Sequence, residues 1–170
     1  FHDEKKFEEL LNSIEKEKIK LKSKTPIVVK ISPDISDNQI KMISKILLKY
    51  KVSAIIISNT TERNRENLRN ILKHQKGGLS GKPLEEKSNK LITNFYNLLE
   101  GKIKIIGVGG VDSGKSAYEK FLAGASYVQL YTGMVFQGPN IVGKIKKELK
   151  ELLINDGVKN FKEIVGKKHN

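Results

Sequence analysis

Polar and glycine-rich segments follow four short apolar runs of this sequence, and their residue types suit them to binding a small polar ligand. The amide and hydroxyl groups of Asn59 and Thr60 can orient such a ligand through hydrogen bonds. Glycines let backbone N–H groups approach an anion closely, and the N-terminus of a following helix favours negative charge. The four segments are residues 30–34, 58–61, 107–110 and 131–133.

The glycines in the last two segments are the most specific sign of a phosphate site. Gly109 and Gly110 open a loop into a helical pattern that starts near Ser113, and the segment 131–133 precedes another helical pattern. Tight turns between a strand and a helix would use the same glycines, so the glycines alone leave both interpretations open. Two such loops on neighbouring strands favour phosphate binding.

Other reactive side chains give weaker signals. Lys30 lies within an apolar run, where a buried ammonium would need a partner, although a lysine at a strand end can also extend to solvent. The histidines His2, His74 and His169 are scattered, and we assign none of them a catalytic role. The sequence has no Cys, no Ser-His-Asp arrangement, no paired-carboxylate motif and no metal-ligand spacing.

These residues must be positioned by alternating strands and helices. Near-continuous apolar runs of strand length predict parallel strands that are buried on both faces. Helical patterns separate the runs, and Ser36 with Gln39 forms a capping box at the start of one of them. Another predicted helix, residues 3–20, precedes the first strand. The predicted strands are residues 27–31, 54–57, 103–106 and 127–130.

This order predicts an α/β fold with a parallel sheet, for which two architectures are open. A four-stranded doubly wound sheet would be complete at this length, whereas a (βα)8 TIM barrel needs about 250 residues and eight strands. We favour the second half of such a barrel, because the leading helix has no strand before it and the chain does not begin with Met. Its last two strands would then be the barrel's seventh and eighth, where phosphate sites often lie.

The connection between the second and third predicted strands carries a further signal. Residues 59–83 are too many for a simple loop between a strand and a helix, since loops without structure or function of their own rarely exceed about 15 residues. Its end, residues 77–83, is rich in glycine and contains the apolar Leu79, which favours a backbone shaped to lie against a ligand over a flexible linker.

Composition excludes several classes of protein. The chain has 170 residues, of which 38% are hydrophobic and 30% charged, as expected of one folded domain. No stretch reaches the roughly 18 apolar residues of a membrane helix. The net charge is +13, but lysines alternate with acidic residues in 1–24 and 144–151, as on solvated helix faces. We therefore expect no nucleic-acid partner.

Taken together and in order, six strings of residues closely resemble dihydroorotate dehydrogenase, in particular its membrane-associated, quinone-using class 2. The family fold is an FMN-binding (βα)8 barrel, so the resemblance implies FMN as the cofactor and agrees with the half-barrel interpretation. The strings are VVKISPD (28–34), SNTT (58–61), GGLSGKP (77–83), IIGVGGVDSG (105–114), LAGASYVQLYTGMVFQGP (122–139) and KEIVGKKH (162–169).

The resemblance implies a role for each residue of the expected site. Lys30 would lie near the flavin ring, where a cation stabilises the negative charge of the reduced ring. Asn59 and Thr60 match residues that hydrogen-bond the pyrimidine substrate. Ser58, Ser80 and Gly81 match residues that contact FMN. The residues that match the backbone cradle of its phosphate are Gly109, Gly110, Tyr131 and Thr132.

The implied reaction is the oxidation of dihydroorotate to orotate in pyrimidine (UMP) synthesis, with quinone as the electron acceptor. No segment matches the family's catalytic base loop, or the N-terminal helices that form the quinone tunnel and touch the membrane. We therefore expect a C-terminal portion of one barrel domain that needs the N-terminal half of the barrel and is inactive alone. It would comprise a leading helix and linker (1–24), four βα units (25–154) and a tail helix (155–170).

The resemblance also implies a location and leaves two alternatives. Class 2 relatives are associated with the mitochondrial inner membrane or the bacterial cytoplasmic membrane. A soluble class 1 dihydroorotate dehydrogenase, or a related FMN-barrel pyrimidine reductase, shares the glycine motifs but uses fumarate or a nicotinamide-linked partner. A Cys at the base position of the full-length protein would favour it. A non-catalytic basic α/β module would instead bind nucleotides, or nucleic acid with an affinity that falls steeply with salt.

Overall fold

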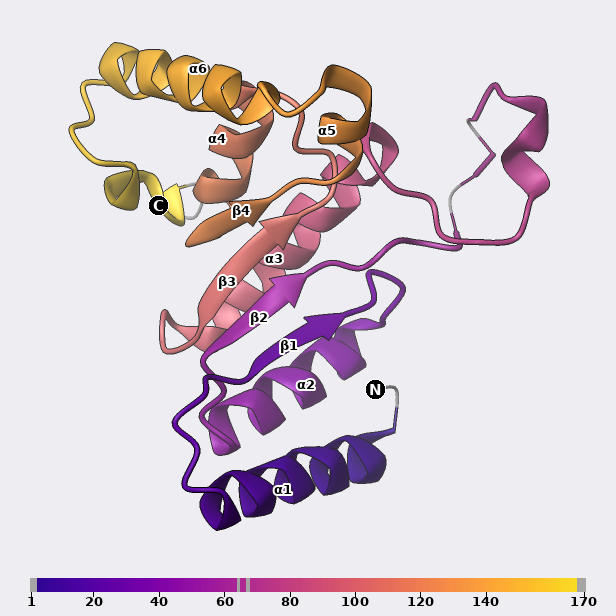
Figure 1. Ribbon diagram of the computed structural model, residues 1–170, viewed down its shortest axis with the longest axis vertical. Coiled ribbons are helices and arrows are strands. Elements are labelled where there is room, and N and C mark those ends of the chain that lie inside the picture. The colour runs from indigo at the N-terminus through magenta and orange to yellow at the C-terminus, as the bar shows by residue number, and fades with distance from the viewer. Residues whose placement is uncertain (1–2, 64, 67, 168–170) are drawn as a thin grey trace.

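The computed structural model describes residues 3–63, 65–66 and 68–167. Strands and helices alternate along most of the chain, and the strands lie side by side in one sheet (Figure 1). With η for a 3-10 helix, the elements in chain order are α1 (Glu4–Lys20), β1 (Val28–Ile31), α2 (Asp37–Lys49), β2 (Ala54–Ile57), η1 (Ile71–His74), η2 (Lys82–Leu84), α3 (Glu85–Leu99), β3 (Lys104–Val108), α4 (Gly114–Leu122), β4 (Tyr127–Gln129), α5 (Thr132–Gln137), α6 (Ile141–Asn155) and η3 (Phe161–Ile164).

The four strands are parallel, and their order in the sheet is their order in the chain. A doubly wound sheet changes direction part-way along its strand order, whereas a (βα)8 barrel adds each new strand on the same side of the last. The observed order therefore confirms the α/β fold and has the topology of part of a barrel. One row across the sheet consists of Lys30, Ile56, Ile106 and Tyr127.

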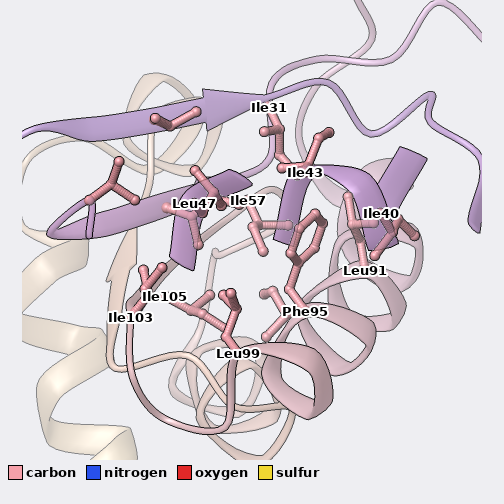
Figure 2. Close-up of a cluster of buried hydrophobic side chains, with 14 of the residues drawn as sticks. Ile31, Ile40, Ile43, Leu47, Ile57, Leu91, Phe95, Leu99, Ile103 and Ile105 are labelled. Atoms are coloured by element: carbon pink, nitrogen blue, oxygen red, sulfur yellow. The ribbon is translucent and has the colours of Figure 1, made fainter. Parts of the chain in front are cut away.

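In the part of the chain that the structure describes, helices cover one face of this sheet and leave the other uncovered. Ile31, Ile57 and Ile105 are buried on the side of α2 and α3, in the larger of two apolar clusters (Figure 2). The opposite face, which we call the open face, carries Val28 and Tyr127, whose exposed fractions are 42% and 57%. Burial on both faces is therefore wrong for the part of the chain described, because an apolar run does not reveal how many of its faces are covered.

A second apolar cluster fixes the C-terminal helices against α4. Phe121 of α4 packs beside Phe161 of η3, with ring centroids 5.2 Å apart, and Ile141 and Ile145 of α6 belong to the same cluster. Val111, which follows the glycines after β3, is buried in this cluster as well. The packing of α4 and α6 thus anchors the loop that carries Gly109 and Gly110.

Helix boundaries follow the capping signals in the sequence. The Ser36 hydroxyl accepts a hydrogen bond from the Gln39 amide (3.4 Å), and the Gln39 side chain accepts one from the Ser36 amide (2.9 Å), which confirms the capping box. In the predicted tail helix 155–170, the structure has the 3-10 helix η3 at Phe161–Ile164 only, after α6 ends at Asn155, and residues 168–170 lie outside the described part. None of the helices described has the length and apolarity needed to cross a bilayer.

Gly143 provides a test of the helix assignment in α6. It is exposed, and a Cβ added there would meet no atom within 4 Å. Because alanine restricts the unfolded chain more than glycine does, we expect Gly143→Ala to raise the free energy of unfolding by about 0.5 kcal/mol. Denaturant titration of the protein measures this change, and a loss of stability would contradict a regular helix at this position.

Candidate functional site

A pocket of about 960 Å³ opens at the carboxyl ends of the strands. This volume lies at the upper end of the range of about 300–1,000 Å³ that is typical of small-molecule and cofactor sites. The pocket brings together all ten site residues singled out in the sequence, from five separate segments of the chain: Lys30, Ser58, Asn59, Thr60, Ser80, Gly81, Gly109, Gly110, Tyr131 and Thr132.

Backbone hydrogen bonds hold Ser58 and Asn59 at the centre of this edge. The Ser58 amide donates to the Val108 carbonyl (3.2 Å), and the Asn59 amide donates to the Ile31 carbonyl (2.8 Å). These bonds continue the pairing of β2 with both of its neighbours beyond the strand itself. The side chain of Asn59 is exposed in the pocket, so its amide group is available to a ligand.

The long connection after β2 returns to the pocket instead of leading away from it. An antiparallel bridge joins Thr61 to Leu79, with N···O distances of 3.1 and 2.7 Å. Ser80 is then placed beside Thr132, and their hydroxyl oxygens lie 2.9 Å apart. Gly81 follows with φ +78°, and a Cβ there would lie 2.9 Å from Thr132 Cγ2. The glycine-rich end of the connection is therefore required for close packing against Thr132 at the start of α5.

The glycines after β3 form a tight backbone turn at the wall of the pocket. Gly110 has φ +76°, in the left-handed region that side chains disfavour, and a Cβ there would lie 2.4 Å from Glu85 Cβ. The chain can therefore pass between the pocket and the start of α3 only without a side chain at this position. This geometry leaves the backbone of Gly109 and Gly110 directly on the pocket wall.

Lys30 stands on the open face near the end of β1, and its side chain is exposed in the pocket. The sequence left open whether Lys30 is buried with a partner or extends to solvent, and in the structure it extends to solvent. The signal for its direction lies in the alternation of β1, where Val29 and Ile31 are buried and Val28 and Lys30 are exposed.

A carboxylate beside the pocket ties three segments together. Asp34 accepts hydrogen bonds from the Thr61 hydroxyl (2.6 Å), the Glu62 amide (3.0 Å) and the ammonium of Lys87 on α3. Burial raises the pKa of Asp34, but the hydrogen bonds from Lys87, Thr61 and Glu62 together outweigh it and hold the pKa below its ordinary value. This network fixes the chain that follows Asn59.

The lowered pKa of Asp34 predicts a pH-dependent contribution to stability. Such a contribution is complete above the unfolded pKa of about 3.9 and is lost as the pH falls through the folded pKa. We expect Asp34→Asn to lower the free energy of unfolding by about 2 kcal/mol at neutral pH, because charged hydrogen bonds are lost. The difference from wild type should shrink below about pH 4.

Denaturant titrations across this pH range provide the measurement. Asp37→Asn, at the exposed start of α2, is the matched control, with an expected change of a few tenths of a kcal/mol. If Asp34→Asn and Asp37→Asn had equal effects at neutral pH, the network would contribute nothing to stability.

The pocket wall also contains polar residues that were not among the sequence-based candidates: Lys82, Asp112, Gln129 and Gln137. Gln129 ends β4, and its polar type within the apolar run 127–130 is a usable signal, since it is exposed on the open face. The Lys82 ammonium lies 2.5 Å from Glu85 and 3.8 Å from Asp112. Its hydrogen bond to Glu85 raises the pKa of Lys82, so this group remains a cation at neutral and moderately alkaline pH.

The short helix α5 adds an apolar surface at the rim of the pocket. Tyr131, Val135 and Phe136 have exposed fractions of 79%, 66% and 83%. Tyr131 and Phe136 also line the pocket. The sequence did not predict this helix, because its six residues are too few to display helical periodicity.

These groups define the chemistry that the pocket can support. Backbone amides, hydroxyls, the Asn59 amide and the cations Lys30 and Lys82 suit an anionic ligand with hydrogen-bonding groups. The carboxylate on the described wall of the pocket is that of Asp112, which faces Lys82. Among the described residues, no group of three or more His, Asp or Glu side chains could hold a metal ion. The polar groups that are present can bind and orient such a ligand.

Comparison with known proteins places this geometry in a family. The family model for dihydroorotate dehydrogenase matches residues 2–153. The mitochondrial dihydroorotate dehydrogenase (quinone) of Arabidopsis thaliana is 43% identical over 145 residues, which are 85% of this chain and 32% of the relative. The corresponding mitochondrial protein of Mus musculus is 41% identical over 155 residues, 91% of this chain and 39% of the relative.

Solved structures agree with the sequence comparisons. Dihydroorotate dehydrogenase from Eimeria tenella in complex with ferulenol superposes with a TM-score of 0.93 and 31% identity, over 99% of this chain and 50% of that one. A ligand-free structure of the enzyme from the same organism gives a TM-score of 0.82 at 37% identity and covers 84% of this chain and 40% of that one. The chain thus spans half or less of the proteins it matches. It belongs to the dihydroorotate dehydrogenase family.

Proposed function

We propose that this chain provides the cofactor and substrate sites of a quinone-dependent dihydroorotate dehydrogenase, which oxidises dihydroorotate to orotate in pyrimidine synthesis. The observation that carries the proposal is the convergence of all ten candidate residues on one pocket at the carboxyl ends of the strands. The relatives that share this family, both dihydroorotate dehydrogenases (quinone), support the reaction and the quinone acceptor. In this proposal, residues 1–170 are the C-terminal portion of one barrel domain.

FMN is the proposed cofactor, and the residues present fit it. The turn at Gly110 has φ +76° and no room for a Cβ beside Glu85, and it leaves backbone on the pocket wall, where a phosphate cradle would need it. Gly109, Thr132 and Tyr131 would complete the cradle, and Ser58, Ser80 and Gly81 would contact the rest of the flavin. When bound, the flavin would supply the hydride acceptor that the side chains of the pocket lack.

The other residues of the pocket would bind and orient the substrate. Asn59 and Thr60 are exposed side by side, and both can donate and accept hydrogen bonds to a pyrimidine ring. Lys30 would place a positive charge beside the flavin ring, and further strands across the open face would remove this ammonium from water and strengthen its field. The wall described here offers no free carboxylate as a base, so we assign proton removal to the remaining half of the barrel.

The apolar rim formed by α5 supports an apolar electron acceptor. Phe136 lines the pocket and Val135 precedes it on α5, and most of both side chains is exposed, a costly arrangement unless another surface or ligand covers them. A quinone ring is apolar and planar, and it would reach the flavin from this side. The membrane contact of such an enzyme would come from the remaining part of the protein, at the mitochondrial inner membrane or the bacterial cytoplasmic membrane.

Steady-state assays of the full-length protein test this function. With dihydroorotate as the donor, we expect orotate to form when a short-chain quinone is the acceptor, and the purified protein to be yellow with bound FMN. Residues 1–170 alone should be inactive. Turnover with fumarate or a nicotinamide cofactor in place of quinone would favour the class 1 or reductase alternative. A colourless protein that forms no orotate would contradict the proposal altogether.

A further inference from the structure

A lysine buried behind the pocket has no role in the function proposed so far. Lys120 of α4 is 0% exposed. Its ammonium donates hydrogen bonds to Asn89 Oδ1 (2.8 Å) and Ser88 Oγ (3.1 Å), both on α3. Both partners are neutral, and Lys120 enters no ion pair with any residue that the structure describes. A desolvated charge without a counter-charge is unfavourable, so its retention requires a reason.

Lys120 is connected to the glycine turn by direct contacts. Its side chain passes beneath β3, where a Cβ on Gly107 would lie 3.0 Å from Lys120 Cδ. Ser88, which accepts from Lys120, donates to the Val108 carbonyl (2.7 Å). That same carbonyl accepts the Ser58 amide (3.2 Å). The buried ammonium therefore stands directly behind the backbone that leads into Gly109 and Gly110.

The other charges around Lys120 compensate its charge only in part. The groove between α3 and α4 is lined by three cations and three anions, which cancel: Lys82, Lys90, Lys115, Glu85, Glu86 and Glu119. Glu85 also lies 2.5 Å from Lys82, which satisfies its charge locally, and the nearby Asp112 lies 3.8 Å from the same lysine at the pocket rim. An anion bound at the glycine turn would provide the missing counter-charge.

We propose that Lys120 is the buried counter-charge for the phosphate of the bound flavin, acting through the glycine turn without touching the phosphate, and so selects FMN over riboflavin. The inference rests on the proposed FMN site. It assigns the phosphate preference to a side chain outside the pocket, because a charge in low dielectric acts over a longer range than one in water.

This assignment predicts a pH dependence of FMN binding. Burial lowers the pKa of Lys120 to about 8, while Glu85 raises it and Lys82 lowers it further. A bound phosphate would favour the ammonium and raise this pKa, so FMN affinity should be highest below pH 8 and fall as the pH rises above it. The second pKa of a phosphate is about 6, so the ligand itself does not titrate in this range. Lys82 remains charged there, because its pKa is raised.

Flavin titrations of the full-length apoprotein test the proposal, with FMN and riboflavin as the two probes. Lys120→Met removes the charge and the hydrogen bonds, and Lys120→Gln keeps a donor for Ser88 and Asn89. We expect both variants to lose about tenfold in FMN affinity with riboflavin affinity unchanged. In both, the fall in FMN affinity between about pH 7 and pH 9 should disappear. Lys150→Met, at an exposed position of α6 outside this groove, is the matched control and should behave as wild type.

The outcomes separate this inference from the proposed function. If the wild-type protein bound neither flavin, the FMN site itself would be wrong. If it bound FMN with a pH-independent preference over riboflavin, and Lys120→Gln kept that preference, Lys120 would not be the counter-charge. An equal loss of both flavins together with a lower melting temperature would reduce Lys120 to a purely structural residue. Should Lys120→Met not fold, Lys120→Gln and the wild-type pH dependence still decide.

Discussion

Gly110→Ala should leave the full-length protein nearly free of FMN. The new Cβ would lie 2.4 Å from Glu85 Cβ and 2.9 Å from Glu85 Cα, so the backbone must move. The φ of +76° adds strain of about 1 kcal/mol for a residue other than glycine. Because the proposed phosphate contacts depend on this backbone, we expect FMN affinity to fall on the order of 100-fold, which corresponds to about 2.7 kcal/mol.

Flavin content after purification and flavin titration of the apoprotein measure this effect. The matched control is Gly143→Ala, the same change at a position where the Cβ meets nothing within 4 Å, and it should retain FMN. A Gly110→Ala protein with the flavin content of wild type would show that the turn after β3 does not hold the phosphate.

Lys30→Met should separate flavin binding from flavin reduction. The change removes the cation on the open face and keeps a side chain of similar length, so FMN should still bind. Reduction of the flavin by dihydroorotate should slow by about 100-fold, because the charge that develops on the ring loses its counter-charge. Stopped-flow absorbance of the flavin in the full-length protein gives this rate, and the reduction potential should become more negative.

The chain supplies a close control for this variant. Lys104 begins β3 on the same open face, at the opposite end of the sheet from Lys30, as the pairing of Ala54 with both Val28 and Lys104 indicates. Lys104→Met removes the same charge from the same face and should leave the rate unchanged. Equal rates for Lys30→Met and wild type would remove Lys30 from the flavin environment.

The positions of the pocket residues could be predicted from the sequence because parallel strands end at one edge. Each apolar run marked a strand to within two residues, so the polar residues after the runs had to converge. The backbone hydrogen bond from the Asn59 amide to the Ile31 carbonyl continues the pairing of β2 with β1, and it follows from that geometry without knowledge of any side-chain contact.

The supporting contacts could not be predicted in the same way. Asp34 meets Thr61 and Lys87 across 27 and 53 residues of sequence, and Lys120 meets Ser88 across 32. No local pattern encodes such pairs, because they depend on how α3 and α4 pack against the strands. The exposure of the open face could not be predicted for a related reason. Val28 belongs to an apolar run, and such a run looks the same whether or not a second layer covers it.

A structure of the full-length protein with FMN and orotate tests the central claim most directly. We predict that the phosphate oxygens lie within about 3.2 Å of the amide nitrogens of Gly109 and Gly110. Orotate should accept or donate hydrogen bonds at Asn59, and the flavin ring should lie beside Lys30. A flavin bound elsewhere, with these strand ends facing only solvent, would contradict the account.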